Sequence, residues 1–133
     1  MAKLEHAKVA AVLREKENKL RAKYGVGDDT IAAAAAHFGK TRDLADKIKI
    51  ALRAQLDVSR DCPYCGLPLG TAMHTDHIYP VSRGGLSTSE NMVLVCEQCN
   101  LKKGDKTLRE FIRENNLDIN RIESALELLG KHF

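Results

Sequence analysis

The sequence predicts a small α+β protein. Its core is held together by a zinc site and is flanked by an N-terminal helical extension and by C-terminal helices. Three observations predict this fold class. Apolar residues recur at helical spacing near both ends of the chain, a short apolar run typical of a buried strand lies between them, and four cysteines form two C-x-x-C pairs. The 133 residues suffice for one domain of ordinary size, or for a small domain with an extension.

The first half is expected to be helical throughout. Helical spacing predicts a first helix over 2–23, which glycines end. A second helix should begin after Asp28 or Asp29 and run through the alanine tract at 32–36. A third should begin at a cap on Thr41 and run to about residue 56.

Charge divides the chain into two parts. Residues 1–60 hold 13 basic and 8 acidic side chains, a net charge of +5, whereas residues 61–133 hold 8 basic and 10 acidic, a net charge of −2. We therefore expect a basic helical extension over 1–60 and a second domain over 61–133. The extension either contacts DNA or forms a dimer interface. Its turn at 37–41 belongs either to a DNA-reading helix-turn-helix or to a plain helical hairpin.

The second half mixes strands with helices. Residues 72–77 can form a short strand, 79–90 read as a loop rich in Pro, Ser and Gly, and 92–95 read as a buried strand. A helix should begin near the second cysteine pair. Two more helices should open at capping boxes, Thr107–Glu110 and Asn120–Glu123.

The cysteines predict a metal site. They pair as Cys62 with Cys65 and as Cys96 with Cys99. In a cytosolic chain such pairs favour metal over disulfide bonds, and four thiolates suit one tetrahedral structural Zn²⁺. Four free thiols or a redox pair are the alternatives.

The composition also bears on location. No apolar run approaches the roughly 20 residues that a membrane helix needs, and the first residues lack the apolar core of a secretory signal. We therefore expect a cytoplasmic protein with no membrane partner.

A further motif lies between and just after the cysteine pairs. In order, it consists of His74, Asp76, His77, Pro80, Gly84, Gly85, Asn91 and Asn100. The string Asp-His-Ile-x-Pro-x-x-x-Gly-Gly, with a later Asn and a Cys-x-x-Cys-Asn-x-x-Lys, resembles the HNH endonuclease family, also called ββα-metal nucleases. The resemblance covers about residues 62–104 and implies a ββα-metal, treble-clef-like core.

The residues suit phosphodiester hydrolysis on chemical grounds as well. A neutral histidine with a pKa of about 6.5 is a suitable base for water at pH 7. Adjacent strand residues point to opposite faces, so Asp76 and His77 should have different roles. Carboxylate and amide oxygens are hard ligands that suit Mg²⁺ or Mn²⁺.

The resemblance implies a role for each position. His77 matches the general base, Asp76 and Asn100 match ligands of the catalytic cation, and Asn91 matches the residue that braces the loop and orients the imidazole. Asn100 stands where the family often has histidine. This H-N-N variant favours a hard cation such as Mg²⁺ or Mn²⁺ over a softer transition-metal ion. His74, two residues before Asp76, either approaches the metal or a phosphate, or is exposed and incidental.

The sequence thus predicts a metal-dependent endonuclease that acts on DNA, and double-stranded DNA is the expected substrate. The resemblance implies 5′-phosphate and 3′-hydroxyl ends. The alternative is a non-catalytic zinc-finger module that binds nucleic acid or protein. Double-strand cleavage by one active site would need a homodimer or two nicks. Basic residues near the motif either contact DNA or are solvated: Arg83, Lys102, Lys103 and Lys106.

Overall fold

The computed structural model describes residues 28–133. The helix expected over 2–23 lies outside the described residues. The helices and strands are α2 (Asp28–Phe38), α3 (Arg42–Val58), β1 (Met73–His77), β2 (Met92–Cys96), α4 (Glu97–Lys103), α5 (Leu108–Glu114) and α6 (Ile119–Leu128). Two short 3₁₀ helices, η1 (Val81–Arg83) and η2 (Ser89–Asn91), lie in the loop between the strands. The α+β class is confirmed.

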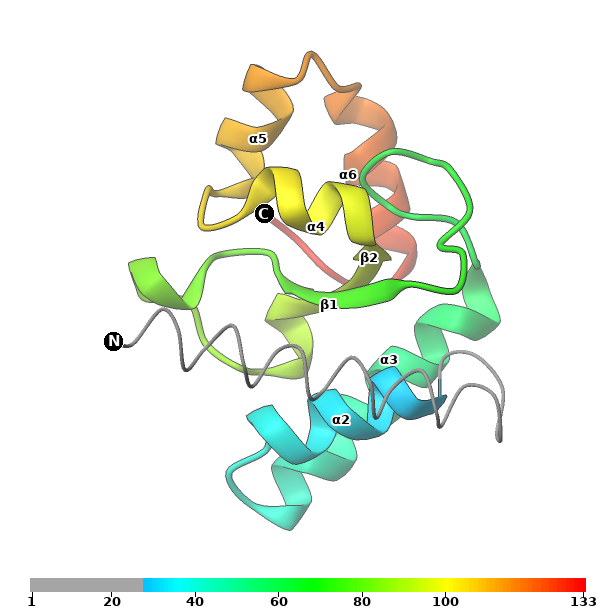
Figure 1. Cartoon of the computed structure of the whole chain (residues 1–133), viewed down its shortest axis with the longest axis vertical. Helices are drawn as coiled ribbons and strands as arrows, with labels where there is room; N and C mark the ends of the chain where they lie inside the picture. The colour runs from blue at the N-terminus through cyan, green and yellow to red at the C-terminus, as the bar shows by residue number, and fades with distance from the viewer. Residues whose placement is uncertain (1–27) are drawn as a thin grey trace.

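The two strands form an antiparallel pair at the centre of the molecule. In their register Asp76 lies opposite Val93, and His77 lies opposite Met92. Helices α2 and α3 lie on one side of this pair, and α4, α5 and α6 lie on the other (Figure 1). Because both faces are covered, the first four residues of β2 are all buried, and its sequence is correspondingly an unbroken apolar run.

Side-chain oxygen atoms cap the starts of α3, α5 and α6. Thr41 accepts a hydrogen bond from the backbone N–H of Leu44 at the start of α3, and Thr107 accepts one from Glu110 at the start of α5. Both caps were predicted from the sequence. The predicted box at Asn120 is wrong, because Asp118 caps α6 by accepting from the N–H of Arg121. Asp and Asn are both good cap residues, and the helix begins at the earlier one.

One hydrophobic core joins residues on both sides of position 60. Ile31, Ile48 and Leu52 from α2 and α3 are at most 1% exposed and belong to the same buried cluster as Leu94 and Ile122. The α2–α3 pair therefore packs on the second half. Whether its turn at 37–41 reads DNA or is a plain helical hairpin stays a prediction. A division into domains at residue 60 stays a prediction.

A buried glutamine ties α3 to the sheet. The side-chain amide of Gln55 donates to the carbonyl of Leu94 and accepts from its N–H, both at 2.7 Å. Leu94 pairs with Thr75 of β1, so Gln55 satisfies backbone groups on the other edge of β2. The Gln55 side chain thus pairs the backbone groups of Leu94 that β1 leaves free. Within the described residues, no helix is long and apolar enough to cross a membrane.

Candidate active site and cysteine cluster

The four cysteines converge at one end of the strand pair. Cys62 and Cys65 lie in the turn before β1, Cys96 ends β2, and Cys99 lies in the first turn of α4. Their sulfur atoms all lie within 4.8 Å of one another. The Sγ atoms of Cys65 and Cys96 are 3.7 Å apart. Four sulfurs bound at about 2.3 Å to a tetrahedral Zn²⁺ would lie about 3.8 Å from one another, so the cluster is compatible with structural zinc.

The backbone supports this cluster with hydrogen bonds to sulfur. The N–H of Cys96 donates to Cys62 Sγ, and the N–H of Cys99 donates to Cys96 Sγ, both at 3.4 Å. A hydrogen bond from Cys99 lowers the pKa of Cys62 to about 5, and the same contact raises the pKa of Cys99. Thiolate is the metal-binding form of cysteine, so the lowered pKa favours that form at Cys62.

Asp76 is a buried carboxylate held by two side chains. It is 5% exposed, and its Oδ2 atom accepts a hydrogen bond from the Tyr64 hydroxyl at 2.7 Å. The Nζ atom of Lys103, itself 1% exposed, lies 3.1 Å from the same oxygen. Burial raises the pKa of Asp76, whereas the charge of Lys103 and the Tyr64 hydrogen bond act to lower it. Oδ1 lies 3.4 Å from Lys103 Nζ, so that oxygen is the less engaged of the two.

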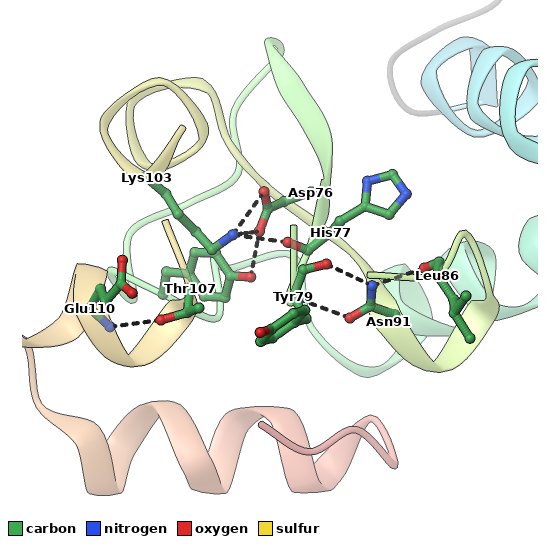
Figure 2. A network of polar contacts seen from close by, with 9 residues as sticks. Asp76, His77, Tyr79, Leu86, Asn91, Lys103, Thr107 and Glu110 are labelled. Carbon is green, nitrogen blue, oxygen red and sulfur yellow. Dashed lines mark hydrogen bonds and ion pairs between the residues drawn. The ribbon is translucent and has the colours of Figure 1, made fainter. Parts of the chain in front are cut away.

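His77 extends from β1 in a different direction. Figure 2 shows its imidazole directed away from the Asp76–Lys103 pair. The Nε2 atom lies 3.0 Å from Ser87 Oγ, and the ring meets the Phe38 ring edge-on with centroids 4.7 Å apart. Burial lowers the pKa of His77, and the positive charge of Lys103 lowers it further. The imidazole is therefore mostly neutral at pH 7, which is the form that accepts a proton.

Asn91 closes the loop that follows His77. Its side-chain oxygen accepts from the N–H of Tyr79 at 2.9 Å, and its Nδ2 atom donates to the carbonyls of Tyr79 and Leu86 (Figure 2). The predicted bracing geometry is thus present in the structure. The hydrogen-bond partner of the imidazole is Ser87 rather than Asn91.

The two glycines of the motif serve this loop. Gly84 has a φ of +98°, which a residue with a Cβ rarely adopts. A Cβ at Gly85 would lie 1.9 Å from the carbonyl oxygen of Tyr79, so only glycine fits there. The close approach that Gly85 permits is therefore to the chain's own backbone.

Asn100 lies on α4, opposite β1. Its Nδ2 atom is 2.9 Å from His74 Nδ1. Asp76, His77 and Asn100 all line one cavity of about 260 Å³, together with residues of η1 and Asp105. The structure thus brings three of the predicted site residues to one place, and Asn91 supports the loop beside them.

The four basic residues expected along DNA differ in their surroundings. Lys102 is exposed, Arg83 pairs with Glu110 at 2.6 Å, and Lys106 pairs with Glu114 at 2.5 Å. The expectation that Lys103 contacts DNA or is solvated is wrong, because its side chain is buried against Asp76 and the carbonyl of His77. A lysine at this position cannot lie along a DNA backbone without leaving its ion pair.

Four contacts of the site were not predicted from the sequence. They come from Tyr64, Lys103, Ser87 and Phe38. Helical phase could have indicated Lys103, since it lies three residues after Asn100 and hence on the same helix face. The contacts of Phe38 and Ser87 join distant segments, and no local pattern signals them.

Known proteins share this arrangement of motifs. Residues 62–106 match the HNH endonuclease family model. The chain thus carries an HNH endonuclease domain. A curated relative, the CRISPR-associated endonuclease Cas9 of Corynebacterium diphtheriae, is 32% identical over 68 residues. That match covers 50% of this chain and 6% of the relative, so the chain spans a small part of the length of the protein that it matches. No solved structure gave a significant match.

Proposed function

We propose that the chain is a metal-dependent endonuclease that hydrolyses phosphodiester bonds in DNA, with His77 as the general base. One observation carries the proposal: Asp76, His77 and Asn100 line the same open cavity. The match to the HNH endonuclease family over residues 62–106 supports nuclease chemistry at this place.

The donor set fits a hard divalent cation. Asp76 offers the Oδ1 oxygen that its protein partners engage least, and Asn100 offers an amide oxygen from the facing helix. Oxygen ligands of this kind suit Mg²⁺ or Mn²⁺. When bound, such a cation supplies positive charge that stabilises the phosphate in the transition state. Residues Asp76 and Asn100 are the proposed ligands.

The chain's own residues provide the proton transfer. If His77 donates its Nε2 proton to Ser87 Oγ, the Nδ1 atom keeps its lone pair for a water molecule. Nδ1 takes one proton as that water attacks phosphorus, and the bond between phosphorus and the 3′ oxygen breaks. The 3′ oxygen gains a proton from solvent. The products are a 5′-phosphate and a 3′-hydroxyl, and a single centre cuts one strand.

The cysteine cluster has a structural role in this proposal. A Zn²⁺ bound by four thiolates would join the turn before β1 to the end of β2 and to α4, which carries Asn100. The metal would then fix the distance between the two elements that present Asp76 and Asn100.

Double-stranded DNA is the proposed substrate, and a homodimer would allow both strands to be cut. Four thiolates with one Zn²⁺ add about −2 to a half that already has a net charge of −2. DNA is a polyanion, so affinity must come from basic surface elsewhere. The net charge of +5 on residues 1–60 makes that half the proposed source.

A zinc-finger module that binds nucleic acid without cutting it is the competing function. The cysteine cluster alone fits both functions. Asp76, a buried carboxylate, and His77, whose pKa is lowered by burial, both line one cavity, and they favour the nuclease because a binding module needs neither.

Plasmid nicking separates the two functions. The zinc-loaded full-length protein should convert supercoiled DNA to open circles with Mg²⁺ or Mn²⁺, and should stop when these cations are omitted. Asp76→Asn should abolish nicking, whereas Asp57→Asn, which alters an exposed carboxylate on α3, should retain it. The 5′ ends of the products should accept a label only after their phosphate has been removed, because the proposed cleavage leaves a 5′-phosphate. Metal-independent cleavage, or DNA binding without cleavage under all conditions, contradicts the proposal.

A further inference from the structure

His74 lies beside the proposed cation centre without joining the cavity lining. Its Nδ1 atom, from β1, is 2.9 Å from the Nδ2 atom of Asn100, from α4. An amide nitrogen has only protons to offer, so His74 Nδ1 must be the acceptor. The imidazole is then neutral and carries its proton on Nε2. Neither ring nitrogen therefore has a lone pair left for a metal ion.

This hydrogen bond fixes the orientation of the Asn100 amide. The terminal torsion of an asparagine side chain is broad, so an unrestrained amide can exchange its oxygen and nitrogen edges. With Nδ2 bound to His74, the carbonyl oxygen occupies the opposite edge. Only that oxygen can ligate a hard cation, because the NH₂ group has no lone pair to give.

We propose that His74 is a positioning residue that presents the Asn100 carbonyl oxygen, and not its NH₂ group, to the cation centre. The inference rests on the proposed function, since it assigns Asn100 as a ligand. It replaces the two sequence-based expectations for His74, which were direct approach to metal or phosphate and an incidental exposed side chain. Mutation of a residue that orients a metal ligand typically weakens metal affinity about 10- to 100-fold.

Cation binding without DNA tests this role directly. Mn²⁺ affinity of the zinc-loaded full-length protein can be measured by electron paramagnetic resonance. We expect His74→Ala to weaken binding about 10-fold. His74→Asn should restore most of the affinity, because its side-chain oxygen can accept at the position of Nδ1. His132→Ala, at an exposed histidine, is the matched control and should bind as wild type. In an Asn100→Ala background, His74→Ala should cause no further loss.

A second measurement does not depend on the cation. Nitrogen-15 NMR of the protein without a divalent cation should show His74 protonated on Nε2 and unprotonated on Nδ1. A proton on Nδ1 overturns the inference even if His74→Ala fails to fold. Wild-type affinity in a folded His74→Ala variant also overturns it, while leaving the proposed function intact. If the wild type binds no Mn²⁺ that depends on Asp76 and Asn100, the proposed function fails instead, and the inference falls with it.

Discussion

At the residue scale, the environment of Asp76 determines whether the site has a usable carboxylate. Its side chain has lost almost all contact with solvent, and burial raises its pKa. Lys103 opposes that shift with a positive charge 3.1 Å away, and Tyr64 opposes it with a hydrogen bond. The ionised form of Asp76 therefore depends on a lysine that is itself buried.

Removing the charge of Lys103 should destabilise the fold. Lys103→Met leaves a buried carboxylate without its ion-pair partner, and the expected loss is about 3–5 kcal/mol in the free energy of unfolding. Urea denaturation of the zinc-loaded protein measures it. The adjacent exposed lysine provides the control, because Lys102→Met should change stability by no more than about 0.5 kcal/mol. Equal stability of the two variants would contradict the buried pair.

The sequence predicted the chemistry of the site better than its surroundings. Asp76, His77 and Asn100 were identifiable because a motif with fixed spacing contains all three. Ser87 could not be identified, since its contact with His77 depends on how the loop between the strands folds back. The burial of Lys103 was missed because neighbouring lysines look alike in composition and differ only in helical phase.

At the scale of elements, helix α3 contributes more to the sheet than its charge pattern suggested. Gln55 is 2% exposed and makes both hydrogen bonds to the free edge of Leu94. Local signals predicted where α3 begins, at the Thr41 cap. They did not predict the edge contact, because a glutamine in a helix is usually solvated.

Loss of the Gln55 contacts should loosen α3 from β2. Gln55→Met keeps the approximate volume but leaves two buried backbone groups unpaired, each at a cost of about 1–3 kcal/mol. We expect the free energy of unfolding to fall by about 2–6 kcal/mol in chemical denaturation. Gln98→Met, at an exposed glutamine on α4, should be nearly neutral. A Gln55→Met variant as stable as Gln98→Met would show that the edge contact contributes nothing.

At the scale of the whole molecule, one core extends across the charge boundary at residue 60. The sequence indicated two parts because net charge differs between the halves, but charge lies on the surface and says little about the interior. Ile31 and Leu52 pack with residues of the second half. A chain that lacks residues 1–60 would therefore lose part of its core as well as its basic surface.

Removal of zinc should affect the whole fold. The four cysteines join segments more than 30 residues apart at the end of the central strands. Metal binding at such a site contributes directly to folding free energy. We expect one zinc per chain by dye-based metal release, and a lower midpoint of thermal unfolding by circular dichroism after chelation. An unchanged midpoint in the metal-free protein would argue against a structural role.

We propose above that His77 activates water at a cation centre formed by Asp76 and Asn100. Single-turnover cleavage of a labelled DNA duplex with saturating Mn²⁺ tests it most directly, because product release and DNA affinity then do not limit the rate. Removal of a general base typically costs about 10²- to 10⁴-fold in rate. We predict that His77→Ala, with zinc content and fold intact, cleaves at least about 100-fold more slowly than wild type. Cleavage by His77→Ala at the wild-type rate would contradict the account.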